Sequence, residues 1–231
     1  MRILCLNPTS SLATTAALVE ASGTWSLRHH CLVETERIRG APERLESPSD
    51  VAAVEFMVQQ RARQLATDGF DAMIVASTMD PGLPGGWALA PVPVIGIGWA
   101  AMRRACGIDW GMLCPSHQAP TMARAQAERY GFGQRLVAVR PASRSDYQPQ
   151  SARLLASEVN RIAASGARSV LLGSASMTRP APAIWELVQV EVIEPLEAAL
   201  DVALAAIRHS IPHGGEVRGR NRMPPWAGPV R

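Results

Sequence analysis

The sequence lacks several residues and motifs that mark common functional classes. It contains no lysine, so arginine supplies every strongly basic side chain. It has no Walker phosphate loop, no HExxH pair and no GxSxG elbow. The sequence therefore lacks the signatures of P-loop NTPases, of HExxH metalloproteases and of α/β-hydrolases. Its four cysteines include no CxxC pair, and no histidine pair accompanies them at zinc-ligand spacing. We therefore expect no metal site.

Charge and hydropathy exclude two further kinds of partner. The longest apolar stretch, residues 87–102, is shorter than a membrane span and is interrupted by prolines. No signal peptide is visible before the first expected strand, so we expect a cytoplasmic protein. The net charge of +3 resides in residues 211–231, which leaves a formally neutral body and no electrostatic case for nucleic acid. That proline- and glycine-rich tail is expected to be disordered.

What the sequence does contain is an alternation of apolar strand and helix patterns. This alternation is typical of a largely parallel sheet with helices on both faces, and it predicts an α/β fold. His29 and His30 fall within one expected strand, where adjacent side chains point to opposite faces and do not form one metal site. The expected strands lie near residues 2–6, 26–32, 72–76, 92–96, 111–114, 136–139, 169–172 and 190–193.

Two segments 97 residues apart, 65–77 and 162–174, read as copies of one unit. Each runs from a helix end through a glycine and a buried strand to a serine at the strand tip. The duplication predicts two pseudo-symmetric, Rossmann-like halves with an active-site cleft between their strand tips. We place the first half in residues 1–98 plus 196–210 and the second half in residues 99–195.

Polar loops follow four of the expected strands, at residues 7–11, 77–80, 116–117 and 174–178. Their hydroxyl, amide and backbone N–H groups suit a carboxylate or an imide-like ring. Serine, threonine and asparagine also cap ordinary helices, but repetition over four loops favours a binding site. Asp80 either acts on substrate or stabilises its turn, and His117 either transfers a proton or is an exposed loop residue.

One motif imitates a dinucleotide-binding loop. Residues 96–101, Gly-Ile-Gly-Trp-Ala-Ala, fit G-x-G-x-x-A after a strand. The motif lies in mid-chain, and no acidic residue follows on a strand about 20 positions later to hold a ribose. We therefore expect no NAD site, and Trp99 is either a pocket wall or a core residue.

The chain resembles the aspartate/glutamate/hydantoin racemase superfamily over residues 1–208, and the hydantoin and allantoin racemase branch is nearest. The resemblance rests on the opening strand with its Asn-Pro-Thr-Ser loop at residues 7–10. It rests further on residues 70–83, which end in Asp-Pro-Gly-Leu, and on residues 173–177, where the family writes G-C-A-G-M.

The resemblance implies a racemase or epimerase that needs no cofactor and acts at the carbon next to a carbonyl of a hydantoin-like or amino-acid-derived substrate. In the family, one cysteine thiolate removes the α-proton and a second thiol returns a proton to the other face. Ser77 and Ser174 occupy those two positions here. The resemblance also implies a homo-oligomer. The expected carboxylate- or carbonyl-binding residues are Asn7, Ser10, Thr78, Ser116 and, through its N–H, Ala175.

The two serines leave three functions open, because a serine hydroxyl is far less acidic than a thiol and needs help from a base. The first is a racemase in which Asp80 or His117 assists the serines. The second is a decarboxylase of malonate-like acids that uses the same cleft. The third is a ligand-binding protein that has the racemase fold but no catalytic activity. We favour the racemase.

Overall fold

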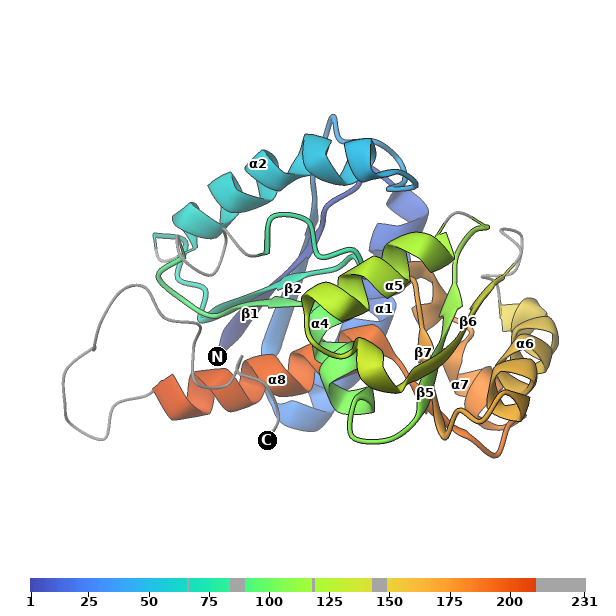
Figure 1. Cartoon of the computed structure of the whole chain (residues 1–231). Coiled ribbons are helices and arrows are strands. Elements are labelled where there is room, and N and C mark those ends of the chain that lie inside the picture. Colours follow the sequence, from blue (N-terminus) through green and yellow to red (C-terminus); the bar gives the residue numbers. More distant parts are fainter. Residues whose placement is uncertain (66, 84–89, 118, 143–148, 211–231) are drawn as a thin grey trace.

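The computed structural model, which describes residues 1–65, 67–83, 90–117, 119–142 and 149–210, forms two parallel four-stranded sheets flanked by helices (Figure 1). The strand orders are β2-β1-β3-β4 and β6-β5-β7-β8, which are equivalent after renumbering. The predicted α/β class with two similar halves is therefore confirmed. The predicted disordered tail, residues 211–231, lies outside the described residues.

The first sheet opens the chain. Its strands are β1 (Arg2–Asn7), β2 (Leu32–Arg37), β3 (Ala72–Val75) and β4 (Val94–Gly96). The helices that accompany it are α1 (Leu12–His29), α2 (Pro48–Gln64) and α4 (Ile97–Ala105). Every residue of β3 is buried, as expected for a central strand that is covered on both faces.

The second sheet repeats this plan. Its strands are β5 (Trp110–Cys114), β6 (Leu136–Pro141), β7 (Ser169–Leu172) and β8 (Glu191–Ile193). Its helices include α5 (Ala119–Arg129), α6 (Ala152–Ala164) and α7 (Ala181–Trp185). Short 3₁₀ helices lie at η1 (Gly133–Arg135), η2 (Pro149–Ser151) and η3 (Ala175–Thr178). The strand β7, like its counterpart β3, is fully buried.

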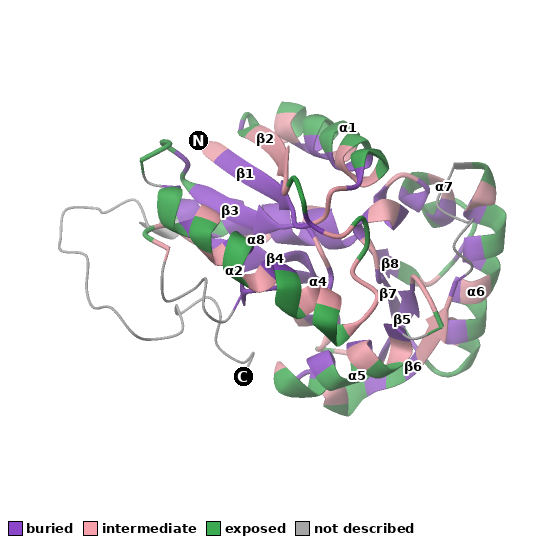
Figure 2. Cartoon of the chain, turned by 90° about the horizontal axis from the view of Figure 1, so that it is seen from above, coloured by how far each residue is buried: buried purple, intermediate pink, exposed green. Residues whose placement is uncertain are grey.

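The last helix, α8 (Pro195–Ser210), follows the second sheet in sequence but contacts α4, α1, β3 and β4. The helix α4 in turn contacts β7 and β8 of the second sheet, so it lies between the two sheets (Figure 1). Figure 2 shows the central strands β1, β3, β5 and β7 as mainly buried, whereas the edge strand β2 is intermediate and the exposed residues lie mostly on the helices. The predicted boundary at residue 98 falls inside α4 and stays a prediction.

The expected strand at residues 26–32 is wrong. The helix α1 continues to His29, because its buried face, with Leu18, Ser22 and Trp25, keeps helical spacing. The ring of His29 stacks on that of Trp25, one turn earlier, with centroids 4.3 Å apart. His30 ends the helix in the left-handed conformation, with φ 52°.

Within the described ranges, no group of three His, Cys, Asp or Glu residues is placed to hold a metal ion.

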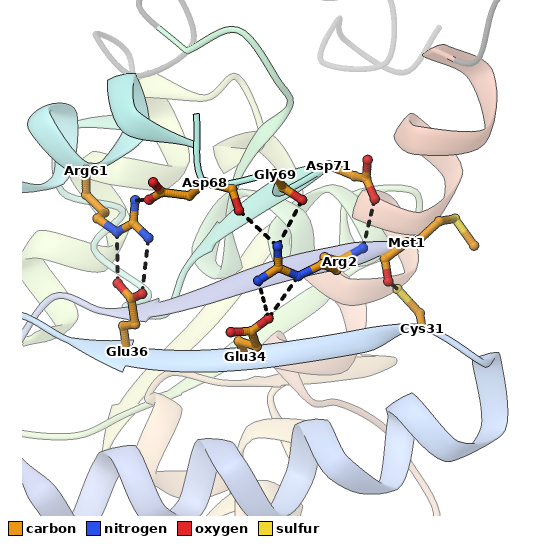
Figure 3. A network of polar contacts seen from close by, with 9 residues as sticks. All are labelled: Met1, Arg2, Cys31, Glu34, Glu36, Arg61, Asp68, Gly69 and Asp71. Carbon is orange, nitrogen blue, oxygen red and sulfur yellow. Dashed lines mark hydrogen bonds and ion pairs between the residues drawn. The ribbon is translucent and has the colours of Figure 1, made fainter. Parts of the chain in front are cut away.

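A network of ion pairs ties the edge strand β2 to its neighbours (Figure 3). Arg2 of β1 bonds Glu34 at 2.7 Å, and Arg61 of α2 bonds Glu36 at 2.8 Å and Asp68 at 2.7 Å. The guanidinium carbons of Arg2 and Arg61 lie 4.6 and 5.6 Å from the ring centroid of Phe70. The network therefore fastens β2, β1 and α2 around one buried aromatic ring.

In the part of the chain that the structure describes, no helix is long and apolar enough to span a bilayer.

Candidate active site

A cavity of about 290 Å³ lies at the carboxyl ends of β1, β3, β5 and β7. The first half contributes Asn7, from the end of β1, and residues 76–79, which follow β3. The second half contributes residues 114–116, at the end of β5, and residues 173–176, which follow β7. The cavity is therefore bounded by both halves, as the duplicated strand tips predict.

Ser77 and Ser174 both line this cavity and are half-buried. The Oγ of Ser77 accepts the backbone N–H of Met79 at 3.3 Å. The Oγ of Ser174 accepts the backbone N–H of Ser176, also at 3.3 Å, and lies 2.7 Å from the hydroxyl oxygen of Ser176. Each serine oxygen thus receives an N–H from the residue two positions later, so the two turns are equivalent in hydrogen bonding.

Two of the predicted binding residues shape the cavity wall with their side chains. The amide of Asn7 donates to the carbonyl of Ser11 at 3.2 Å and to the hydroxyl of Thr15 at 3.0 Å. The hydroxyl of Thr78 donates to the carbonyl of Gly173 at 2.8 Å. Both residues line the cavity, but these donors are directed at the protein. Their positions fit the prediction that they belong to the site, whereas their bonds indicate a structural task.

The remaining predicted residues divide into two groups. Ser116 and Ala175 line the cavity. Ser10 does not, because its backbone N–H donates to the carbonyl of Pro42 at 3.1 Å and its own carbonyl accepts from Arg37. The neighbours of Ser10 in the loop, Thr9 and Ser11, line the cavity instead. His117 is exposed and lies outside the lining.

Asp80 lies behind the serine turn, buried and outside the cavity lining. Its carboxylate accepts the backbone N–H groups of Gly98 at 2.9 Å and Trp99 at 2.6 Å, the first turn of α4. It also accepts the hydroxyl of Tyr130 at 2.9 Å and the amide of Gln126 at 3.2 Å. Burial raises the pKa of Asp80 to about 7, although these donors oppose the shift. Trp99 is a core residue, 2% exposed.

The second half holds its serine turn with a different carboxylate, which sequence reasoning missed. Glu194 is buried and accepts the hydroxyl of Thr178 at 2.7 Å and the backbone N–H groups of Leu196 and Glu197. It therefore caps α8 while it holds η3, the turn that follows Ser174. Burial raises the pKa of Glu194. Its place just before a helix was the signal that could have revealed it.

Other lining residues were also missed. Cys114, at the tip of β5, is fully buried among the lining residues, and burial raises its pKa to about 12. Its strand-tip position was a usable signal. An apolar part of the wall comes from Met79, Met112 and Met122. The charged lining residues are Glu43, Arg44, Glu46 and Arg179, two of each sign, for which the sequence carries no visible pattern.

Comparison with known proteins points to one family. The family model for Asp/Glu/Hydantoin racemase matches residues 3–203. The chain is 28% identical over 216 residues to a hydantoin racemase from Rhizobium meliloti, which covers 90% of this chain and 89% of that protein. The structure of an allantoin racemase from Klebsiella pneumoniae shares the fold with a TM-score of 0.83, at 24% identity over 95% of this chain and 97% of that chain. A mutant of arylmalonate decarboxylase shares it with a TM-score of 0.66, at 16% identity over 95% and 96% of the two chains.

Proposed function

Because this chain belongs to the Asp/Glu/hydantoin racemase family, we propose that it is a cofactor-independent racemase of 5-substituted hydantoins. The observation that carries the proposal is the meeting of Ser77 and Ser174 at one cavity, each on an equivalent turn of its own half. The hydantoin racemase relative supports the substrate class. We also propose that the enzyme works in the cytoplasm as a homo-oligomer.

The proposed reaction is proton exchange between the two faces of one carbon. Because neither Asp80 nor His117 lines the cavity, a hydroxide ion from solvent first takes the hydroxyl proton of Ser77 and leaves as water. The Ser77 alkoxide then takes the proton from the ring carbon next to a carbonyl, the C–H electron pair forms a carbon–carbon double bond, and the carbonyl π pair moves to the oxygen. Ser174 then gives its hydroxyl proton to the opposite face of the planar intermediate, and the carbonyl re-forms. Ser174 remains as the alkoxide and starts the reverse direction. The backbone N–H donated to each serine oxygen stabilises its charged form.

The lining of the cavity supports an uncharged ring that carries an apolar substituent. Among the described lining residues, two acidic and two basic side chains are present, and the basic Arg179 is already paired with Glu20 at 3.2 Å. These residues therefore offer no excess positive charge that would favour a dicarboxylic amino acid. Met79, Met112 and Met122 supply flexible thioether side chains that adapt to substituents of different shape. Allantoin, whose substituent is polar, is expected to be a poorer substrate than 5-benzylhydantoin.

The test is exchange of the α-proton in deuterated water together with loss of optical rotation. We expect exchange and racemisation of 5-benzylhydantoin, and loss of racemisation in Ser77→Ala and in Ser174→Ala. The matched variant Ser77→Cys/Ser174→Cys is expected to be faster by about tenfold or more, since thiols ionise more readily. Folded wild-type protein that exchanges no proton of hydantoins, allantoin or aspartate contradicts the proposal.

The same two serines favour a second candidate, a ligand-binding protein that has lost catalysis. Its expected signature is calorimetric binding of a hydantoin without proton exchange, and the double cysteine variant should then gain activity. Decarboxylation is separated from both by incubation with an arylmalonate. Release of carbon dioxide would establish it, and an unchanged arylmalonate removes it.

A further inference from the structure

We infer that Thr78 is a positioning residue that sets the gap between Ser77 and Ser174, and this inference rests on the proposed function. The hydroxyl of Thr78 donates to the carbonyl of Gly173 at 2.8 Å across 95 residues of sequence. Thr78 is only 5% exposed, so water does not compete freely for the bond. The bond joins the turn after β3 in one half to the end of β7 in the other.

The Thr78 side of this bond is held rigidly by α4. A side chain at Gly98 would collide with the backbone carbonyl of Thr78, so α4 approaches this turn as closely as a glycine allows. The N–H of Asp80 donates to the carbonyl of Ser77 at 3.0 Å, and the carboxylate of Asp80 grips the first turn of α4. The turn therefore has little freedom to move away from the second half.

The Gly173 side is equally constrained. Its N–H donates to the carbonyl of Leu113 at 2.7 Å, which extends the pairing of β7 with β5. A Cβ at position 173 would lie 2.6 Å from that carbonyl and 2.9 Å from the methyl carbon of Met112. The backbone is thus packed against the sheet, and the position of its carbonyl is fixed by the second half.

Each serine is the chain neighbour of one end of the bond. Consecutive Cα atoms are about 3.8 Å apart, so the path from Ser77 to Ser174 crosses one peptide link, the Thr78–Gly173 hydrogen bond and one further peptide link. Two groups that exchange protons with opposite faces of one carbon need a defined separation, and a misplacement of about 1 Å can cost about 100-fold in rate. The Thr78 hydroxyl therefore sets the separation between Ser77 and Ser174, on which the reaction rate depends.

The bond is made once and not twice. At the offset of 97 residues that relates the serines, the counterpart of Thr78 is Ala175, which has no hydroxyl. The second half therefore has no equivalent donor at this position to replace the bond if it is lost. The β-branched side chain of threonine also restricts the rotation about χ1 that directs the hydroxyl. A serine side chain restricts this rotation less.

The test compares Thr78→Val, which keeps the shape and removes the donor, with Thr78→Ser, which keeps the donor. The control is Thr67→Val, because the hydroxyl of Thr67 donates to a backbone carbonyl at 2.7 Å but only within its own exposed turn. We expect Thr78→Val to lower kcat for 5-benzylhydantoin racemisation by about tenfold to 100-fold with KM little changed. Thr78→Ser should recover most of kcat, and Thr67→Val should match the wild type. A Thr78→Val protein that is folded at the assay temperature and keeps kcat within about twofold overturns the inference.

A second measurement needs no catalysis. In a Ser77→Cys/Ser174→Cys/Cys114→Ala background, thiol cross-linkers of graded length report the gap, and peptide mass spectrometry locates the bridge. We expect one length to dominate while Thr78 is present and the preference to disappear with Thr78→Val. A length preference that survives Thr78→Val overturns the inference even if racemisation is established. A wild type inert toward all substrates together with a lost preference removes the proposed function but supports the role of Thr78.

Discussion

The carboxyl group of Asp80 accepts hydrogen bonds from α4, which lies between the two sheets, and from Gln126 of α5, which accompanies the second sheet. Tyr130, just after α5, is a further donor, and Asp80 itself adopts a positive φ of 48°. Aspartate tolerates this left-handed conformation better than most residues do, which suits it to the turn. These hydrogen bonds are all to protein groups and Asp80 lies outside the cavity lining, so Asp80 supports the serine turn from behind.

This burial gives the protein a predictable dependence on pH. The pKa of Asp80 rises from an ordinary 3.8 to about 7, so between these values the folded state binds more protons than the unfolded state. Its contribution to stability is complete below pH 3.8 and is lost as the pH rises through 7, at up to about 1.4 kcal/mol per pH unit. We expect Asp80→Asn to flatten the fall in the free energy of unfolding between pH 5 and pH 7, measured by urea titration.

Two further variants make this prediction sharper. Tyr130→Phe removes a donor that lowers the pKa of Asp80, so it should extend the fall to higher pH. Glu194→Gln should flatten part of the slope that remains, because burial raises the pKa of Glu194 in the same direction. An Asp80→Asn protein with the wild-type slope would show that Asp80 stays ionised in the fold.

At single residues, the sequence was informative where position along a strand decides the outcome. Serines at the tips of two duplicated strands are expected to face the same ligand-binding region. Ser77 and Ser174 do line one cavity. Ser10 was misplaced by one residue, because the path of the loop depends on bonds to distant residues such as Pro42 and Arg37. The partner of Thr78 was invisible for the same reason, since Gly173 is distant in sequence.

At the scale of elements, buried strands were easier to predict than the ends of helices. The central strands β3 and β7 were found at their true places, because continuous apolar runs between turn signals suit few other structures. The end of α1 was missed, because Ser26 to Leu32 offers no proline or glycine and the stop depends on the left-handed His30. Periodicity alone does not reveal a helix stop that the backbone makes without glycine.

The edge strand β2 offers a test of how the first sheet is fastened. Phe70→Leu keeps an apolar side chain but removes the ring that Arg2 and Arg61 both face. Phe132→Leu is the matched control, because Phe132 is similarly buried, at 6% exposed against 5% for Phe70. We expect Phe70→Leu to cost about 0.5–1 kcal/mol more than Phe132→Leu in the free energy of unfolding, by urea titration. If both variants lose the same free energy of unfolding, the contacts of the two guanidinium groups with the ring of Phe70 contribute no net stabilisation.

At the scale of the molecule, α8 makes the two halves depend on each other. It leaves the second sheet and buries Leu196, Leu200 and Leu204 in a core that also contains Ile3, Ile74 and Met112. From the sequence, residues 196–210 are assigned to the first half, and α8 contacts β3, β4 and α4. A second apolar cluster, which includes Val159 and Val170, lies within the second half, but the larger cluster contains residues of both sheets. That shared cluster predicts that the halves unfold together.

Leu200 tests that dependence. It is 1% exposed, so Leu200→Ala should lower the free energy of unfolding by about 2–5 kcal/mol, whereas Leu154→Ala, at a residue 63% exposed, should change it little. Circular dichroism and tryptophan fluorescence should give one coincident transition in both variants, because Trp25 and Trp110 report on different halves. Two separate transitions in Leu200→Ala would mean that each sheet is stable alone.

The contrast between Asp80 and Glu194 also bears on the history of the chain. In one copy the acid sits on the turn and the helix begins with Gly96; in the other the acid sits at the helix start and the turn offers Thr178. A side chain added at Gly96 would strike the carboxylate of Asp80. Glycine at position 194 would remove the carboxylate that accepts hydrogen bonds from the hydroxyl of Thr178 and from the backbone N–H groups of Leu196 and Glu197. Reversing either change alone would therefore cost stability, so the difference between the two copies is maintained by these paired contacts.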